Sequence, residues 1–241
     1  MSANFEEIDY QETPIGPVSL RRQRLKMFDN REIFEVKLGN DYLMSSLFTV
    51  VEEALSNLGL KEVSAASPDV VVGGLGLGYT AATVLDHAHV NSLVVVDFLQ
   101  PVIDWHQRGL VPLGPRLTAD PRCRFVHGDF FALSAPHGGG FDPRQPDRRW
   151  HAILLDIDHS PDHLLHPRHA EFYSESGLRA FSQRLLPGGV FGMWSDDPPE
   201  AGFLKNLRAV FVEVRAEVVK FPNPFLHRDS ESTVYVCKVA E

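Results

Sequence analysis

The pattern of hydrophobic and polar positions divides the chain into a short β segment and a longer region in which strands and helices alternate. Near the start, Pro17–Arg24 and Glu32–Met44 partly alternate apolar and polar residues, and Asp29-Asn30 between them is typical of a turn. These segments predict a small N-terminal β-hairpin. Residues 1–14 are polar and are expected to be loosely ordered.

The rest of the chain predicts a sheet covered by helices. Apolar residues recur at helical spacing from Phe48 to Leu58, and Gly59 stands where a helix would end. Five apolar segments predict buried strands: Asp69–Val72, Ser92–Val96, Arg124–His127, Ala152–Leu155 and Val190–Trp194. Helices are predicted among them at Tyr79–Asp86, Pro101–Arg108, Glu175–Leu185 and Glu200–Val210. This alternation indicates an α/β fold with a doubly wound, Rossmann-like parallel sheet.

Two further segments complete this outline. Val214–Phe221 and Thr233–Val239 are predicted to pair as a C-terminal antiparallel hairpin. Ser134–Arg149 is rich in glycine, proline and charge and is predicted to be an insertion loop. The chain is therefore expected to consist of an N-terminal β-hairpin extension over residues 1–46 and a Rossmann-like domain over residues 47–241.

Composition narrows the classes of partner. The 241 residues carry 23 Lys plus Arg against 32 Asp plus Glu, and a net charge of −9 disfavours binding to nucleic acid. The two cysteines, Cys123 and Cys237, lie far apart, which disfavours a disulfide framework or a cysteine-based zinc site. The start of the chain lacks the pattern of a signal peptide, and no apolar run reaches the ~18 residues of a membrane span. A cytoplasmic protein without membrane contact is expected.

A glycine-rich loop is the strongest local motif. Gly74, Gly76 and Gly78 form G-x-G-x-G directly after a predicted strand and at the start of a predicted helix. Glycines there let the backbone approach a ligand, and the helix N-terminus offers unpaired N–H groups. The next strand ends at Asp97, where doubly wound folds often place an acid that binds ribose hydroxyls. A nucleotide-like ligand is predicted, and both NAD and S-adenosylmethionine fit.

Three further segments, in their order along the chain, make it resemble the spermidine synthase group. They are RCRFVHGDFF, AILLDIDHSP and HAEFYSESGLRAFSQRLLPGGVF, and the resemblance covers roughly Val70 to Trp194. It implies the class I S-adenosylmethionine-dependent methyltransferase fold. It also implies that Asp129 and Phe130 contact the adenine and that Asp156 stands at the position of the catalytic aspartate.

The chain departs from this family at three places. The acid of the family's glycine loop falls on Gly76, a tyrosine-containing pair falls on Ser45-Ser46, and the last aspartate of a D-S-S-D segment falls on His159. In aminopropyltransferases the first acid is implied to bind the amino end of decarboxylated S-adenosylmethionine. Three hypotheses follow: aminopropyl transfer from that donor to a polyamine, methyl transfer from S-adenosylmethionine, or adenosyl-ligand binding without catalysis.

Acidic residues are predicted to gather beyond the carboxyl ends of the strands, where open α/β sheets bind ligands. An amine of pKa ~10 must lose a proton before it attacks, and Asp156 is the residue predicted to orient it. The residues predicted to bind the polyamine are Asp158, His159, Tyr173, Trp194, Asp196 and Asp197. The alternatives are a strand-end cap for Asp156, a solvated turn for Asp196-Asp197 and core packing for Trp194.

A group of histidines raises the question of a metal site. Four lie within eleven residues: His159, His163, His166 and His169. Pro161 and Pro167 interrupt any single helix through them, so the rings need not converge. No metal is predicted, and His159 is expected to be a hydrogen-bonding group of the site.

The N-terminal hairpin also predicts an assembly. Its apolar residues occupy both faces: Ile33, Phe34, Val36, Leu38, Tyr42, Leu43 and Met44. A two-stranded hairpin is marginal in water unless it packs on another surface, so one face would cover the core and the other would seek a partner. Proteins of the family that the chain resembles commonly pair through this region. A homodimer is expected, and the alternative is a hairpin folded entirely against its own domain.

Overall fold

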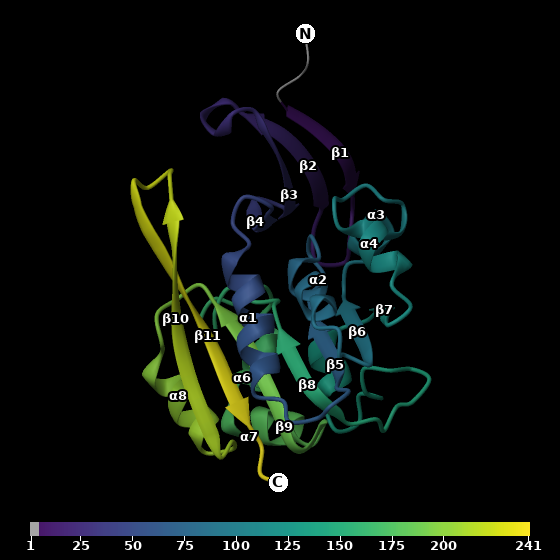
Figure 1. Cartoon of the computed structure of the whole chain (residues 1–241), viewed down its shortest axis with the longest axis vertical. Helices are drawn as coiled ribbons and strands as arrows, with labels where there is room; N and C mark the ends of the chain where they lie inside the picture. The colour runs from purple at the N-terminus through teal and green to yellow at the C-terminus, as the bar shows by residue number, and fades with distance from the viewer. Residues whose placement is uncertain (1–4) are drawn as a thin grey trace.

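The computed structural model describes residues 5–241, in which a small sheet stands over one end of a larger one (Figure 1). The small sheet contains β1 (Phe5–Gln11), β2 (Val18–Leu25), β3 (Arg31–Leu38) and β4 (Asp41–Ser45). Its order is β1-β2-β3-β4, and every neighbouring pair is antiparallel.

The N-terminal sheet is larger than the hairpin that the sequence predicted. Phe5–Gln11 forms β1, so the expectation of a loosely ordered start is wrong there, while residues 1–4 lie outside the described part. FEEIDYQ has little apolar alternation because β1 is an edge strand whose residues are mostly exposed. The predicted strand Glu32–Met44 is in fact two strands, since Gly39 adopts a φ of +58° and reverses the chain between β3 and β4.

The large sheet has seven strands. They are β5 (Asp69–Gly73), β6 (Ser92–Asp97), β7 (Cys123–His127), β8 (Trp150–Leu155), β9 (Leu185–Ser195), β10 (Glu213–Asn223) and β11 (Arg228–Lys238). Their order is β10-β11-β9-β8-β5-β6-β7. The strands from β5 to β9 pair in parallel, whereas β11 pairs antiparallel with both β9 and β10. The predicted doubly wound sheet with a C-terminal antiparallel hairpin is confirmed.

Helices cover both faces of this sheet. They are α1 (Val50–Lys61), α2 (Tyr79–Asp86), α3 (Gln100–Gln107), α4 (Gly114–Ala119), α5 (Phe130–Ser134), α6 (Ala170–Tyr173), α7 (Glu175–Ser182) and α8 (Ala201–Arg208), with 3-10 turns η1 (Lys26–Phe28) and η2 (Pro167–His169). Val70 and Val72 pack with residues of α1, α2 and α3, whereas Val71 packs on the opposite face with residues of α7 and α8. Because β5 is buried on both faces, all of its central residues are apolar.

Gly59 does not end the first helix, as the sequence suggested, but lies inside α1. A Cβ atom on Gly59 would approach Leu154 Cδ2 to 2.7 Å, so glycine lets α1 lie directly on β8. Figure 1 shows α1 crossing in front of this part of the sheet. The close approach places the first turn of α1 over the carboxyl ends of the parallel strands.

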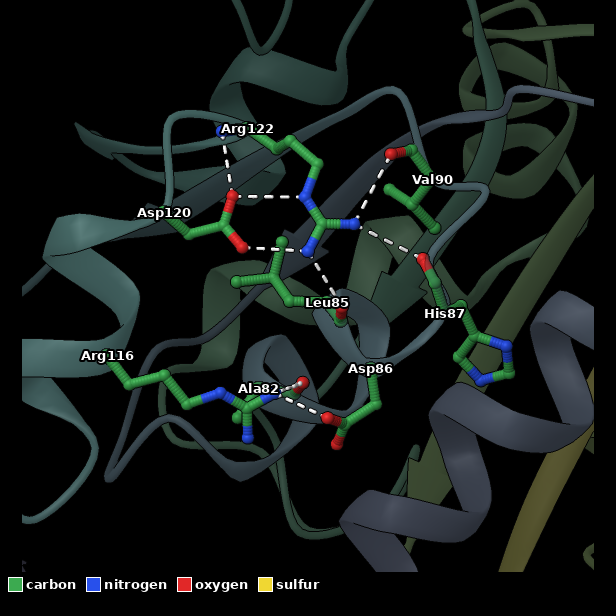
Figure 2. A network of polar contacts seen from close by, with 8 residues as sticks. All are labelled: Ala82, Leu85, Asp86, His87, Val90, Arg116, Asp120 and Arg122. Atoms are coloured by element: carbon green, nitrogen blue, oxygen red, sulfur yellow. Dashed lines mark hydrogen bonds and ion pairs between the residues drawn. The ribbon is translucent and has the colours of Figure 1, made fainter.

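Two arginines, one in α4 and one in the loop that follows it, bind backbone and side-chain groups of α2 and its C-terminal end (Figure 2). The Arg122 guanidinium binds the Asp120 carboxylate and donates to the Leu85 and His87 carbonyl oxygens at 2.8 and 3.3 Å. Arg116 donates to the Ala82 carbonyl oxygen and pairs with Asp86 at 2.6 Å. These contacts satisfy carbonyl groups that a helix end leaves free, and they fix the helix that begins at the glycine loop.

Within residues 5–241, none of the helices has the length and apolar character needed to cross a membrane.

Candidate active site

A cavity lies between the N-terminal sheet and the carboxyl ends of the parallel strands. It encloses about 1120 Å³ of empty space when its mouth, which is open to solvent, is included. The N-terminal sheet, with the loop between β1 and β2, supplies an apolar wall that includes Ile15, Val36, Leu38, Leu43 and Met44. The opposite side carries the polar groups, so the two sheets together form the site.

Of the residues predicted from the sequence, seven line this cavity: Gly74, Gly76, Asp97, Asp129, Phe130, Asp156 and Trp194. Six lie outside its lining: Gly78, Asp158, His159, Tyr173, Asp196 and Asp197. The cavity also contains residues that the sequence analysis did not assign to the ligand site, among them Met44, Glu52, Phe131 and His169.

The glycine loop passes the end of β8 at very short range. A Cβ atom on Gly74 would lie 2.0 Å from the carbonyl oxygen of Asp156, so only glycine fits there. Gly74 and Gly76 also have φ angles of +95° and +47°, a region that glycine adopts readily. The loop therefore brings its backbone into the cavity beside Asp156, as the motif predicted.

Asp97 holds the glycine loop. It is nearly buried at the end of β6, and its carboxylate accepts from the backbone N–H groups of Leu75 at 2.8 Å and Leu99 at 2.7 Å. Burial raises the pKa of Asp97, although these backbone donors oppose the increase. Asp97 also lines the cavity, so its predicted contact with a ribose would be made by a carboxylate that is already fixed in place.

His106 and Met44 each form a hydrogen bond with the glycine loop. His106 on α3 is fully buried and donates through Nε2 to the Gly76 carbonyl oxygen at 3.0 Å, and burial lowers its pKa to about 4. Met44 Sδ accepts from Leu77 N at 3.2 Å. A Cβ atom on Gly76 would lie 3.0 Å from this sulfur, so the Met44 thioether lies beside the position where the resemblance expected an acid.

Asp129 and its neighbours lie at the β7 end of the cavity. Asp129 Oδ1 caps α5 by accepting from the backbone N–H groups of Phe131 and Ala132, at 3.0 and 3.2 Å. Phe130 is almost completely buried and stacks on Phe141 with 4.8 Å between ring centroids. Only a small part of its surface lines the cavity. Phe131, which the sequence did not predict, is less buried and offers the more accessible aromatic surface.

Asp156 and Glu52 are the central acids of the cavity. Asp156 follows β8, and its Oδ2 accepts from Thr80 Oγ1 on α2 at 2.6 Å. Glu52 projects from the first turn of α1. Burial raises the pKa of Asp156 to about 6 despite the Thr80 hydrogen bond. Burial, and next the charge of Asp156, raise the pKa of Glu52 to about 8.

The two acids have no cationic partner inside the protein. Across residues 5–241, the ion pairs shorter than 4.0 Å include neither Glu52 nor Asp156. A buried carboxylate is costly unless a charge or hydrogen-bond donors compensate it. The pair therefore favours a ligand that brings a positive charge and N–H donors to this point of the cavity.

Asp158 has a different environment from Asp156, two residues earlier. It is buried, and its carboxylate accepts from Leu165 N at 2.7 Å, His169 Nδ1 at 2.9 Å and Tyr173 Oη at 2.8 Å. Tyr173 is itself buried, and burial together with the Asp158 charge raises its pKa well above the usual value. The structure thus places both predicted polyamine-binding residues behind the cavity wall.

The other predicted acceptor residues lie along the end of β9. Trp194 lines the cavity and lies 6.2 Å from the His159 ring between centroids. Asp196 and Asp197 are exposed, and Asp196 accepts a hydrogen bond from Ser232 Oγ at 3.2 Å. These acids lie outside the cavity lining.

The histidines of the loop after β8 form two separate pairs. The rings of His159 and His163 are 4.9 Å apart, and those of His166 and His169 are 5.9 Å apart. In the described part of the chain, no three His, Cys, Asp or Glu side chains form a grouping suited to a metal ion. Cys123 and Cys237 are free, and burial raises the pKa of both thiols.

Comparison with known proteins identifies a curated relative and similar solved structures. No protein-family model matches the chain. The chain is 29% identical over 165 residues to polyamine aminopropyltransferase 2 of Pseudomonas aeruginosa, a match that covers 64% of this chain and 43% of that protein. The matched region therefore spans less than half the length of this curated relative.

Solved structures agree on the fold. Spermidine synthase from Thermotoga maritima superposes with a TM-score of 0.70 at 17% identity, over 96% of this chain and 72% of that one. A spermidine synthase in complex with the transition-state analogue AdoDATO gives a TM-score of 0.70 at 16% identity, with the same coverage. The chain has the spermidine synthase fold, which is the class I methyltransferase-like fold that the sequence resemblance implied.

Proposed function

We propose that this chain transfers an aminopropyl group from decarboxylated S-adenosylmethionine to a di- or polyamine. The observation that carries the proposal is the half-buried acid pair, Glu52 and Asp156, which lies beside the glycine loop and has no ion-pair partner within residues 5–241. The name of the Pseudomonas relative and the fold of the spermidine synthases support the same assignment.

The reaction requires alignment more than acid–base strength. The sulfonium of the donor is a built-in leaving group: the amine nitrogen forms a bond to the aminopropyl carbon while the carbon–sulfur bond breaks. The sulfur keeps the electron pair of that bond, which gives methylthioadenosine. Asp156 would bind the ammonium form of the acceptor, take a proton directly or through water, and hold the free amine in line with the carbon.

Glu52 would supply the second negative charge of this step. With both carboxylates ionised, the pair balances a cationic acceptor beside the cationic donor, which would otherwise repel each other. Trp194 and the apolar wall formed by Leu43 and Met44 would contact methylene groups. This assigns charge recognition to the acids and recognition of the carbon chain to the walls.

An assay with purified protein tests the proposal directly. Incubation with decarboxylated S-adenosylmethionine and putrescine, spermidine or cadaverine should release methylthioadenosine in equal amount to the aminopropylated amine. Absence of turnover with every amine would overturn the catalytic proposal. Binding of the adenosyl ligand without turnover would instead identify a non-catalytic relative.

Methyl transfer from S-adenosylmethionine is the second candidate. It is favoured by Gly76, because an acid at that position would repel the methionine carboxylate, and Met44 is the residue found beside it. Against it, Glu52 and Asp156 add negative charge to the same cavity. Calorimetry with both sulfonium nucleosides separates the candidates: tighter binding of the decarboxylated form disfavours methyl transfer.

We also propose that the N-terminal sheet mediates a homodimer. Both of its edge strands expose aromatic residues: Phe5 and Tyr10 on β1, and Tyr42 on β4, are each about half exposed. Its other face already contributes Val18, Leu20 and Val36 to the core. Light scattering on dilute protein tests the proposal, since a mass near 27 kDa at micromolar concentration would contradict it. The cytoplasmic location stays a prediction.

A further inference from the structure

His169 is a cavity residue whose orientation is fixed from behind. It ends the turn η2 and lines the cavity, and its side chain is 14% exposed. Its Nδ1 lies 2.9 and 3.0 Å from the two carboxylate oxygens of Asp158. Its ring stacks on Phe131 with 3.9 Å between centroids and 23° between planes. Two independent contacts therefore hold the ring in one position.

The partners of Asp158 determine which nitrogen of His169 carries the proton. An ionised carboxylate only accepts hydrogen bonds, and Asp158 also accepts from Leu165 N and Tyr173 Oη. His169 Nδ1 must therefore donate. In the neutral ring Nε2 is then an acceptor, and no donor within residues 5–241 lies within hydrogen-bond distance of it.

The order of the strands indicates which part of a nucleoside lies near His169. Along the carboxyl edge of the sheet, Asp156 follows β8, the glycine loop follows β5, Asp97 follows β6 and Asp129 follows β7. With the reacting group at Asp156 and the ribose near Asp97, the base extends toward β7. Phe131 lies in the first turn of α5, which begins directly after Asp129. His169 stacks on Phe131, so it lies at the end of the cavity where the base is expected.

We propose that His169 selects a 6-aminopurine through its unprotonated Nε2. The amino group of adenine donates a hydrogen bond to this nitrogen, whereas the 6-carbonyl of hypoxanthine would place an acceptor against an acceptor. Asp158 and Tyr173 act as positioning residues that keep the ring in the required tautomer. This inference rests on the proposed function, since it assumes that an adenosyl thioether occupies the cavity.

Calorimetry with two nucleosides tests the selection without any need for turnover. At pH 8, methylthioadenosine should bind roughly 10- to 100-fold more tightly than methylthioinosine. Equal affinities would overturn the role of His169 and leave the proposed function intact. Failure of both nucleosides to bind would overturn the proposed function itself.

Variants assign the effect to His169. His169→Asn presents both a donor and an acceptor, so it should lower the preference at least tenfold, mainly by weakening methylthioadenosine. Asp129 is present in both proteins, so its own contribution cancels in the comparison. Tyr173→Phe keeps the Asp158–His169 pair and should change the preference less than threefold. An unchanged preference in His169→Asn would overturn the inference.

The tautomer can be observed separately from binding. Nitrogen-15 spectra of histidine-labelled protein at pH 8 should show His169 with the proton on Nδ1. In Asp158→Asn, an amide N–H facing Nδ1 should move the proton to Nε2 and weaken or reverse the preference for methylthioadenosine. A wild-type His169 with its proton on Nε2 would overturn the inference even if Asp158→Asn does not fold.

Discussion

The polar groups on the two sides of the cavity differ in how many hydrogen-bond and ion-pair partners they have within the protein. On the glycine-loop side, the polar groups bind the loop itself: Asp97 accepts from backbone N–H groups, and His106 Nε2 donates to the Gly76 carbonyl oxygen, while the buried His106 Nδ1 has no hydrogen-bond partner within residues 5–241. On the acid side, Asp156 has one side-chain donor, Thr80, and Glu52 has no ion pair in the described chain. Satisfied groups define a shape, whereas uncompensated buried carboxylates select a charge. Under the proposed function, this difference separates nucleoside positioning from amine binding.

The largest effect is expected at the acid that would contact the reacting amine. Asp156→Asn keeps the shape of the side chain and an oxygen that can accept from Thr80 Oγ1, but it removes the negative charge. Because a positioned acid–base group contributes roughly 10²- to 10⁴-fold, kcat for methylthioadenosine release should fall by that factor while nucleoside affinity changes little. Steady-state kinetics and calorimetry measure the two quantities.

Asp197→Asn is the matched control for this substitution. Asp197 lies at the same edge of the sheet but is exposed and outside the cavity lining. Its neutralisation should change kcat less than threefold, because a solvated charge acts only weakly at a distance. An Asp156→Asn enzyme with wild-type activity, or an equal loss in both variants, would remove the distinction between buried and solvated acids.

A smaller effect is expected for Glu52, and it should depend on pH. Carboxyl groups with pKa values of about 6 and 8 lose their protons as pH rises through that window. Affinity for a diamine, which remains cationic below pH ~10, should therefore increase between pH 6 and 8. Glu52→Gln should weaken diamine binding roughly tenfold at pH 8 and flatten this increase.

Proton counting sharpens the test of Glu52. Calorimetry in buffers of different ionisation enthalpy should show that wild-type protein releases protons when a diamine binds at pH 7, because the cation favours the ionised acids. The Glu52→Gln variant should release fewer protons than the wild type when a diamine binds at this pH. Glu53→Gln, an exposed neighbour on the same helix, is the control and should match the wild type.

The fold could be predicted from the sequence because its signals are local. Apolar runs, the glycine motif and the turn residues predicted β5 to β11 and the helices α2, α3, α7 and α8, although β9 and β11 each begin five residues earlier than predicted. The short helices α4, α5 and α6 were not predicted. The edge strand β1 was missed because its sequence, FEEIDYQ, has no buried face to impose alternation. The predicted N-terminal sheet therefore lacked β1, a strand that is stabilised by pairing with β2 more than by burial of its side chains.

The site was only partly predictable because burial of a polar group is a tertiary property. Asp156 and Asp158 look equivalent in the sequence, yet only Asp156 reaches the cavity, since Leu165, His169 and Tyr173 fold over Asp158. Glu52 was not predicted, because the apolar spacing of its helix indicates only the face that packs on the core. The only available signal was an acid in the first turn of a helix that precedes the glycine loop.

On the glycine-loop side, the expected effect is on the free energy of unfolding and not on amine binding. Burial lowers the folded-state pKa of His106 to about 4, whereas an unfolded histidine titrates near ~6.5. The unfolded chain therefore binds more protons between these values, so stability is full above pH ~6.5 and is lost as pH falls toward 4. Between pH 7 and 5 this histidine should cost about 2 kcal/mol of unfolding free energy.

Urea unfolding at the two pH values measures this loss. His106→Gln removes the titrating group and can still donate to the Gly76 carbonyl oxygen, so its stability should depend less on pH by about the same amount. His89→Gln provides the control, because His89 is exposed. Equal acid sensitivity of the His106 variant and the wild type would show that His106 is protonated without cost in the folded protein.

The smallest effect is expected at Met44, the residue that joins the N-terminal sheet to the glycine loop. Met44→Leu keeps the apolar volume but removes the sulfur that accepts from Leu77 N at 3.2 Å. One lost hydrogen bond of this kind is worth about 1 kcal/mol or less, which corresponds to a decrease in Tm of roughly 2–4 °C. The freed loop should also bind methylthioadenosine a few-fold more weakly. Diamine affinity should stay constant, because Glu52 and Asp156 are untouched and leucine keeps the apolar contact that Met44 offers to methylene groups. Met27→Leu, at an exposed methionine of the same sheet region, should leave Tm and both affinities unchanged. A Met44→Leu protein that loses diamine affinity but not nucleoside affinity would contradict the division of the cavity into a shape-defining and a charge-selecting side.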